Sequence, residues 1–324
     1  MTPEVCVVVP AYNEERHVEE CIRSLLEVNY PKDKLRLIFV DDCSTDSTPE
    51  IIKEYARKHG HLSYLKTCGA GPSKARNLGT EVCDAEFVAF TDADCTVDRE
   101  WIRELLKGFT SPEVAGVGGV QRAHREETEF GRCVQLFLEL SGIVGEYTRS
   151  SRHPVEVEHN PSCCSMYRRR VLLEAGGFQE DLWPGEDVEL DHRLRRSGYR
   201  LMHVPGAVVY HRRPQSWRAF AKMMRSYGGV QAYLLRKYGF FRRMHYVPFA
   251  TLAMAAAWLL ASLAYPPLLL LPAGAAALVL VLLLGRTGSL TRSLRVLALL
   301  ATAVVFWNLG FFSRLLRREA VSYK

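Results

Sequence analysis

The stretch VAFTDADCTVDREWI, Val88–Ile102, joins a short apolar run to two carboxylates placed one residue apart. The run Phe87–Phe90 is typical of a buried strand, because it is short and continuous. Asp92 and Asp94 follow it directly, and on an extended segment alternate side chains point to the same side. Two like charges this close repel each other. The pair therefore predicts a bound cation or, alternatively, a cap for the helix expected from about Asp98.

Strand-like and helical patterns alternate on both sides of this stretch. The strand-like runs are Val5–Val9, Leu35–Val40, Leu62–Leu65, Phe87–Phe90 and Val114–Val120. The helical patterns lie at about Glu14–Leu26, Thr48–Lys58, Ser73–Val82 and Arg99–Phe109. This alternation predicts an α/β fold, with a mostly parallel sheet covered by helices on both faces. Ligands of such sheets bind at the carboxyl ends of the strands, where three acid-bearing loops are expected to meet.

A dinucleotide-binding fold shares this alternation, so the loop after the first strand is decisive. That fold requires a glycine-rich GxGxxG turn there. The residues that follow Val9 are PAYNEE, which contain no glycine. A GxG pair occurs later, at Gly69–Gly71, but alone it is weak evidence, and the sequence has no Walker-type lysine motif. The chain is therefore not expected to bind a dinucleotide in this way.

From about Tyr246 the sequence becomes almost continuously apolar. Three stretches, at about 247–265, 267–284 and 294–312, each approach the roughly 17–25 residues that cross a bilayer as a helix. A buried hairpin in a soluble core is the alternative, but soluble core helices are seldom apolar on every face for this long. The expected division is an α/β domain at 1–212, a basic amphipathic interface region at 213–245 and transmembrane segments at 246–324.

The charges are distributed as unevenly as the apolar residues. No Asp or Glu occurs between Asp191 and Glu319, so the net charge of +6 combines an acidic front with a basic rear. The segment Arg212–His245 carries nine Arg or Lys residues directly before the first apolar stretch. Contact with membrane lipids explains this position more simply than nucleic-acid binding does.

The same basic segment predicts an orientation. The positive-inside tendency predicts a multi-pass protein of the cell membrane with a cytoplasmic front domain, and the lack of an apolar signal segment before Val5 agrees. Three crossings would place Arg314, Arg317 and Arg318 outside, so the number of crossings stays open. The nine cysteines show no CxxC pairs, and we expect buried small side chains rather than a zinc site or a disulfide framework.

Five motifs in one order carry a resemblance to a known family. They are VVVPAYNEE (Val7–Glu15), FVDDCSTDST (Phe39–Thr48), GPSKARNLG (Gly71–Gly79), FTDADC (Phe90–Cys95) and GEDVELDHRLRRSGYR (Gly185–Arg200). Together they resemble the inverting family 2 glycosyltransferases of GT-A fold, over about Val5–His211. The resemblance implies a catalytic domain that takes a sugar from a nucleotide-diphosphate sugar, with Mg²⁺ or Mn²⁺ holding the diphosphate.

The resemblance implies roles for the carboxylates of the opening stretch. In the family's DxD motif the second acid, here Asp94, binds the metal, and the first, Asp92, serves the ribose or a metal-bound water. The chemistry needs such ligands, because a hard cation neutralises the charge that develops on a diphosphate leaving group. His211 ends a strand-like run and is either a third ligand, as in some relatives, or a solvated histidine.

Further motif residues are expected to bind the donor. Asp42, with Asp41 beside it, takes the family's position for the base or ribose, and a plain turn is the alternative. The same nucleotide pocket would be lined by Pro10, Tyr12 and Glu14. Near the start of an expected helix lie the basic pair Lys74 and Arg76, and Asn77 beside them. Such a pair suits a pyrophosphate, and a solvated helix start is the alternative.

Asp187 is the expected general base, because an acceptor hydroxyl is a poor nucleophile until its proton is taken. A helix cap is the alternative role. Glu186 is expected to orient Asp187 or to bind the acceptor, and Trp183 either stacks on a sugar or packs in the core.

The acceptor is expected to be a hydroxyl, on a lipid-linked or other molecule. The alternatives are a polyprenyl-phosphate sugar synthase and a non-catalytic nucleotide-sugar-binding scaffold. The segment Gln215–Arg218 departs from the QxxRW motif of processive synthases, which predicts addition of a single sugar. Ser216–Tyr238 is expected to lie in the membrane interface or to pack on the catalytic domain. Phe130–Tyr147 is expected to be a helix that walls the acceptor site or belongs to the core.

Overall fold

The computed structural model describes residues 2–69, 71–142 and 153–317, which form two compact units. The first consists mainly of residues 1–126 and 144–212, and the second of residues 127–143 and 213–320. The expected division after residue 212 coincides with a boundary between the units. Residues 127–143, which we assigned to the first domain, group instead with the C-terminal helices. The three-part division itself stays a prediction.

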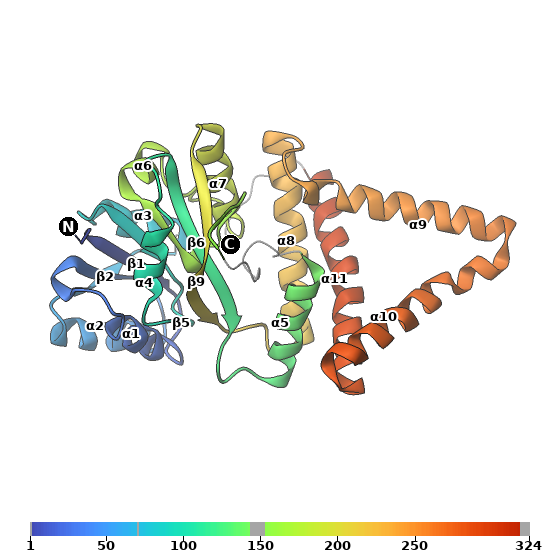
Figure 1. Cartoon of the computed structure of the whole chain (residues 1–324), viewed down its shortest axis with the longest axis horizontal. Coiled ribbons are helices and arrows are strands. Elements are labelled where there is room, and N and C mark those ends of the chain that lie inside the picture. The colour runs from blue at the N-terminus through green and yellow to red at the C-terminus, as the bar shows by residue number, and fades with distance from the viewer. Residues whose placement is uncertain (1, 70, 143–152, 318–324) are drawn as a thin grey trace. The chain divides into compact units, whose positions relative to one another are not determined.

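The first unit is built on a mixed sheet of nine strands among the described residues, in the order β3-β2-β1-β4-β8-β6-β9-β5, with β7 pairing with β9 (Figure 1). The strands are β1 Val5–Ala11, β2 Leu35–Asp41, β3 Leu62–Lys66, β4 Phe87–Phe90, β5 Cys95–Val97, β6 Val114–Ala123, β7 Val155–Glu156, β8 Ser165–Arg168 and β9 Arg200–His211. Most run in one direction, and β5, β7 and β8 run against their neighbours. The α/β prediction is thus confirmed.

Helices cover both faces of this sheet, because successive side chains of each strand point to opposite sides. In β1, Val5, Val7 and Val9 belong to one core cluster, whereas Cys6 and Val8 belong to the other. Helices α1, α2 and α4 bury their apolar sides in the first cluster, and α3, α6 and α7 do so in the second. The helices are α1 Val18–Leu26, α2 Thr48–Lys58, α3 Gly71–Glu81, α4 Trp101–Lys107, α6 Arg169–Glu174 and α7 Glu186–Arg196.

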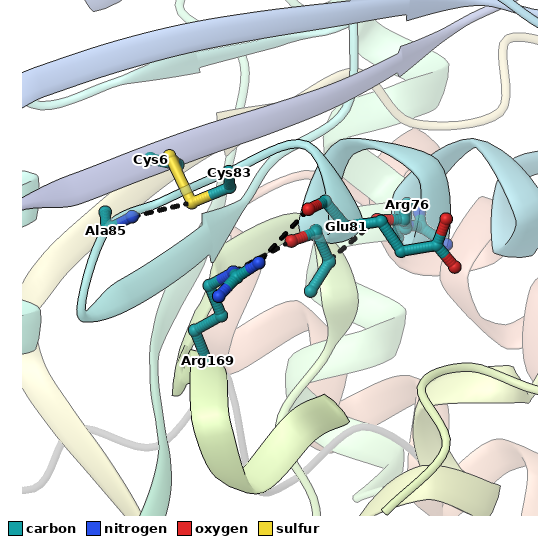
Figure 2. The surroundings of a disulfide bond; sticks show 7 residues. Cys6, Arg76, Glu81, Cys83, Ala85 and Arg169 are labelled. Carbon is teal, nitrogen blue, oxygen red and sulfur yellow. Dashed lines mark hydrogen bonds between the residues drawn. A yellow bond between two sulfur atoms is a disulfide. The ribbon is translucent and has the colours of Figure 1, made fainter. Parts of the chain in front are cut away.

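The cysteines correct one expectation. Cys6 in β1 and Cys83 just beyond α3 form a disulfide, although we expected only unbonded small side chains (Figure 2). The pairing could not be read from the sequence, because 77 residues separate the two cysteines. Arg169 at the start of α6 also fastens the end of α3, since its Nε donates to the carbonyl of Thr80 at 3.0 Å. The helix that carries Arg76 is therefore anchored at its far end.

The second unit is helical, with α5 Glu129–Ser141, α8 Trp217–Tyr238, α9 Val247–Ala264, α10 Leu271–Thr287 and α11 Leu290–Leu316. Among the described residues, three helical spans are long and apolar enough to cross a membrane: Arg243–Ala264, Pro266–Thr287 and Leu290–Leu316. Helix α8 packs tightly on α11, where an added Cβ at Gly228 would lie 2.1 Å from the carbonyl oxygen of Trp307. Its Phe220 ring also meets Phe137 of α5, with centroids 5.2 Å apart.

These contacts bear on two expectations about amphipathic helices. Helix α8 packs on α11 and α5 of its own unit, and its expected place in the membrane interface or on the catalytic domain stays a prediction. Helix α5 ends at Ser141 and packs against α11, so it is part of the helical core, and residues 143–147 of the expected helix lie outside the described residues. Gln215 is a structural residue here, because its Nε2 donates to Glu127 Oε1 at 2.5 Å.

Candidate active site

The topology of the sheet brings the predicted loops to one edge. Asp41 ends β2, Asp92 and Asp94 follow β4, and His211 ends β9, and these strands run in the same direction. The antiparallel strands add residues that a purely parallel sheet would not place there. Strand β5 begins at Cys95, which pairs with His211 across the ladder. Strand β8 starts directly after the short 3₁₀ turn Ser162–Cys164.

Asp92, Asp94 and His211 lie close enough to hold one metal ion. One ligand atom from each, together with the Sγ of Cys95, lies within 4.8 Å of the others. His211 Nε2 is 3.4 Å from Asp94 Oδ2, and the two side chains are 25% and 28% exposed. Burial opposes both charges, yet their interaction lowers the pKa of Asp94 and raises the pKa of His211 well above its usual value. Carboxylate oxygens suit hard divalent cations and imidazole completes the set, so the residues fit the expected ion.

Arg76 joins the cation cluster to the expected base. Its guanidinium is 2% exposed, and it donates from Nη2 to Asp92 Oδ1 at 2.8 Å and from Nη1 to Glu186 Oε1 at 2.7 Å. Burial disfavours its charge, but Asp92 and Glu186 raise the pKa of Arg76 above its ordinary value. We expected Arg76 to contact the donor diphosphate. In the structure its two terminal nitrogens donate to carboxylates, so it ties the loop after β4 to the start of α7, and its contact with the donor stays a prediction.

Glu186 and Asp187 are the first two residues of α7 and follow a glycine with a positive φ angle. Gly185 precedes them with a φ of 97°, a conformation that favours glycine. Glu186 is fully buried, and its burial raises the pKa of its carboxyl to about 7, with the Asp187 charge adding to the rise and Arg76 opposing it. Asp187 accepts the N–H of Ser162 on Oδ2 at 3.1 Å and the N–H of Val188 on Oδ1 at 2.8 Å. Two backbone donors therefore set the orientation of the expected base.

A buried histidine faces this base. His159 Nε2 lies 3.8 Å from Asp187 Oδ2, and its Nδ1 lies 2.9 Å from Asp191 Oδ2. Asp191 is itself held by the hydroxyl of Tyr167 at 2.8 Å and the N–H of Asn160 at 2.7 Å. Burial raises the pKa of Asp191, against the effect of these hydrogen bonds. The arrangement fixes the imidazole ring between two carboxylates.

The carboxylates expected to bind the nucleotide also organise their own loops. Asp42 accepts the Thr67 hydroxyl on Oδ1 at 2.6 Å and the Gly71 N–H on Oδ2 at 2.8 Å, so it joins the end of β3 to the start of α3. Asp41 is fully buried and accepts the N–H of Ser44 and the hydroxyl of Tyr64, each at 3.2 Å. Asp42, rather than Asp41, retains some exposed surface.

The remaining predicted donor residues differ in their surroundings. Tyr12 is 59% exposed and Lys74 is also exposed, whereas Pro10 is buried in β1. Burial raises the pKa of Glu14, whose Oε2 lies 2.9 Å from His17 Nδ1. Asn77 uses its side-chain amide on the backbone of Phe178, donating and accepting at 2.8 Å each, so it holds the loop before α7.

Sequence reasoning missed the residues that support the site from beneath. His159 and Tyr167 lie outside the motifs, and Asp191 lies within the fifth motif but was given no role. The three side chains meet only in the tertiary structure, where Asp191 of α7 accepts the hydroxyl of Tyr167 of β8 and contacts His159. Cys163 was also missed, and its Sγ lies 4.0 Å from His211 Nδ1. A hydrogen bond with Cys95 lowers the pKa of the Cys163 thiol to about 7.

Comparisons with known proteins agree with this geometry. The family model described as Glycosyl transferase family 2 matches residues 6–176. The Probable glycosyltransferase YdaM of Bacillus subtilis is 26% identical over 244 residues, 73% of this chain and 57% of that protein. The Pre-mycofactocin glycosyltransferase of Mycobacterium tuberculosis is 31% identical over 231 residues, 71% of this chain and 47% of that protein. The chain thus spans about half the length of these relatives.

Two further comparisons cover more of both chains. The dolichyl N-acetyl-alpha-D-glucosaminyl phosphate 3-beta-D-2,3-diacetamido-2,3-dideoxy-beta-D-glucuronosyltransferase of Methanococcus voltae is 24% identical over 260 residues, 77% of this chain and 79% of that protein. Among solved structures, the mannosyltransferase PcManGT from Pyrobaculum calidifontis, in complex with GDP-Man and Mn²⁺, superposes with a TM-score of 0.71 at 24% identity. The superposition covers 98% of this chain and 89% of that one. This likeness establishes the fold.

Proposed function

The chain belongs to glycosyl transferase family 2 and has the GT-A fold, and from this premise we propose that it is a membrane-bound inverting glycosyltransferase. It would transfer one sugar from a nucleotide-diphosphate sugar to a hydroxyl acceptor. The observation that carries the proposal is the Arg76 bridge, which holds Asp92 of the cation cluster and Glu186, beside Asp187, at one edge of the sheet. The proposed donor site and the proposed base would thus be linked through a single buried side chain.

The donor would lie over the cation cluster. Asp92, Asp94 and His211 would hold a divalent cation, Mg²⁺ or Mn²⁺, which when bound neutralises the charge that develops on the leaving diphosphate. The exposed Lys74 is placed at the start of α3, where backbone N–H groups also favour anions. Asp42 and the Pro10–Glu14 loop would form the nucleotide pocket. The solved relative that holds GDP-Man and Mn²⁺ supports this assignment.

Asp187 would act as the general base. The acceptor oxygen attacks the anomeric carbon opposite the diphosphate, the bond to the diphosphate oxygen breaks, and the acceptor proton passes to Asp187. Attack from this side inverts the anomeric centre. His159, held by Asp191, would orient the Asp187 carboxylate, because its Nε2 faces Oδ2 while two backbone N–H groups fix the other directions.

A lipid-linked acceptor is the natural substrate for this arrangement. The three apolar spans are consistent with membrane anchoring, and a relative named for a dolichyl-linked acceptor supports a lipid carrier. We propose that the α/β unit faces the cytoplasm, on the basis of the basic segment before the first span. Disulfides such as Cys6–Cys83 are rare in the cytosol of mesophiles, so the orientation needs its own test. A membrane-impermeant maleimide should label the exposed Cys68 in inverted vesicles and not in intact cells.

The central experiment is a screen of radiolabelled nucleotide sugars against membrane lipids, with the full chain in detergent or proteoliposomes and counts read in the lipid phase. Asp187→Asn should lower turnover about 100- to 10,000-fold while donor binding by calorimetry is retained. Asp94→Ala should abolish the metal dependence of donor binding. The matched control is Asp181→Asn, which removes an exposed carboxylate from the preceding loop.

The outcomes separate the alternatives. If bare polyprenyl phosphate is glycosylated and the product still forms with Asp187→Asn, the protein is a polyprenyl-phosphate sugar synthase, and the hydroxyl acceptor is wrong. If the donor binds but no acceptor is glycosylated, the hypothesis of a non-catalytic nucleotide-sugar-binding scaffold is supported. Metal-dependent binding that survives Asp94→Ala would overturn the metal assignment.

A further inference from the structure

Two buried thiols belong to the candidate cation cluster or adjoin it. Cys95 begins β5 next to Asp94, and Cys163 lies in the 3₁₀ turn before β8. The Sγ atoms of Cys95 and Cys163 and one imidazole nitrogen of His211 all lie within 4.8 Å of one another. Three different elements supply these atoms, and the pairing of Cys95 with His211 across β5 and β9 fixes two of them in register. The group is therefore a product of the fold, not of a local motif.

The spacing and burial of this group fit a site for a soft metal ion. Two sulfurs bound tetrahedrally to zinc at about 2.3 Å lie about 3.8 Å apart, a separation that the observed limit of 4.8 Å includes. Cys163 Sγ is 4.0 Å from His211 Nδ1. Both thiols are buried, whereas the side chain of His211 is 25% exposed. An ion would therefore enter past His211 and reach the sulfur atoms behind it.

The imidazole ring of His211 divides the pocket into two positions. Its Nε2 faces the carboxylate of Asp94 at 3.4 Å, and its Nδ1 faces the thiol of Cys163. The position beside Nε2 offers the carboxylates of Asp92 and Asp94, which suit Mg²⁺ and Mn²⁺, and the position beside Nδ1 offers the thiol of Cys163, which favours Zn²⁺ and similar ions. Cys95 is within reach of both, because its Sγ is 3.7 Å from Asp94 Oδ1 and within 4.8 Å of the ligand atoms of Cys163 and His211. Because one ring serves both positions, occupation of one disturbs the other.

We propose that Cys95, Cys163 and His211 form a second metal site, specific for a soft divalent cation such as zinc, that adjoins the candidate donor-cation site. Zinc bound there excludes the hard cation and so inhibits the transferase. Binding displaces the protons held by the two thiols and by the coordinating nitrogen of His211, which pass to the buffer, and it changes no oxidation state. The inhibition rests on the proposed function, whereas zinc binding itself does not.

Cobalt is the probe for the site, because Co²⁺ replaces Zn²⁺ and its bonds to thiolates absorb in the near ultraviolet. The full chain is prepared metal-free in detergent, with its free cysteines reduced. It should bind one Co²⁺ and show a thiolate charge-transfer band. Zn²⁺ should remove this band, and excess Mg²⁺ should not. Cys163→Ser should weaken Co²⁺ binding at least about tenfold and reduce the band. The matched control is Cys164→Ser, since this adjacent buried thiol faces the carbonyl of Ala207 at 3.9 Å and should leave the band unchanged.

A measurement on the unaltered protein covers the case in which the variants fail to fold. Zinc should protect Cys95 and Cys163, and not the exposed Cys68, from alkylation as read by peptide mass spectrometry. Equal alkylation with and without zinc, or a cobalt spectrum without a thiolate band, would overturn the site.

Activity separates this inference from the proposed function. Zinc should raise the Mn²⁺ concentration needed for half-maximal transfer, and Cys163→Ser should reduce that effect at least about tenfold. If no sugar is transferred under any condition but the thiolate band forms, the proposed function fails and the metal site stands. If transfer occurs and zinc binds without competing with Mn²⁺, the exclusion is refuted.

Discussion

Replacing Glu186 by glutamine should make the stability of the α/β unit less dependent on pH. Burial, reinforced by the charge of Asp187, raises the pKa of Glu186 from 4.5 to about 7, although Arg76 lies 2.7 Å away. In the unfolded chain this carboxyl ionises near its ordinary pKa. Between these two pKa values the unfolded state loses the proton and the folded state keeps it, so ionisation favours unfolding.

The magnitude follows from the difference between the two pKa values. A rise from 4.5 to about 7 corresponds to about 3 kcal/mol, because each pKa unit is worth about 1.4 kcal/mol. This destabilisation is absent below pH 4.5, grows as the pH approaches 7 and is constant above that. Glutamine cannot ionise but can still accept a hydrogen bond from Arg76. The free energy of unfolding of the variant, relative to the natural protein, should therefore increase by about 3 kcal/mol across this range.

The assay is unfolding of the full chain in detergent, followed by tryptophan fluorescence at several pH values between 4.5 and 8. A change of 1 kcal/mol shifts the midpoint of a domain of this size by roughly 2–4 °C. Glu174→Gln is the control, because it removes an exposed carboxylate from the neighbouring helix α6. A stability difference between Glu186→Gln and the natural protein that stays constant from pH 5 to pH 8 would refute the reasoning.

Three further predictions test the site and the fold. His159→Gln should lower kcat roughly 10- to 100-fold and shift its pH profile, with donor KM unchanged, because Asp187 loses its orienting partner; an unshifted profile would contradict this. Gly310→Ala should cost about 1–3 kcal/mol in thermal unfolding, since its Cβ would lie 2.0 Å from a carbonyl oxygen of α8, whereas Gly274→Ala meets nothing within 4 Å and should be neutral. Cys83→Ser should lose about 2–4 kcal/mol and no longer respond to reductant; continued sensitivity to reductant would exclude the disulfide as the cause.

Local sequence patterns were sufficient to predict the elements of the fold. The apolar runs at Val5–Val9 and Phe87–Phe90 have no polar face, so they have to be covered on both sides, which requires a sheet between two helical layers. Parallel strands place their carboxyl ends together, and this alone predicted that Asp42, Asp92 and Asp94 would meet at one edge. The three described helical spans that are long and apolar enough to cross a membrane were equally predictable, because length and apolarity are properties of the segment itself.

The supporting contacts of the site depended on topology. Arg76 reaches Glu186, 110 residues away, because α3 and α7 share a core cluster and not because of any spacing in the chain. The contacts of His159 with Asp187 and Asp191 form only when α7 packs on the sheet beside β8. Strand β8 is antiparallel to β4, and we did not anticipate it.

Asp92 and Asp94 show the same difference between what the sequence predicts and what the tertiary structure adds. Chemistry and motif order predicted a cation at Asp92 and Asp94, which directly follow strand β4. The tertiary structure decided what surrounds them: an arginine on Asp92, a histidine on Asp94 and two thiols beneath. Side chains brought together by strand pairing carry no periodic trace in the sequence, because their separation along the chain is set by the lengths of the connections. The sequence by itself thus determined the strands and their functional ends, and the packing of distant elements determined the charges and ligands that act there.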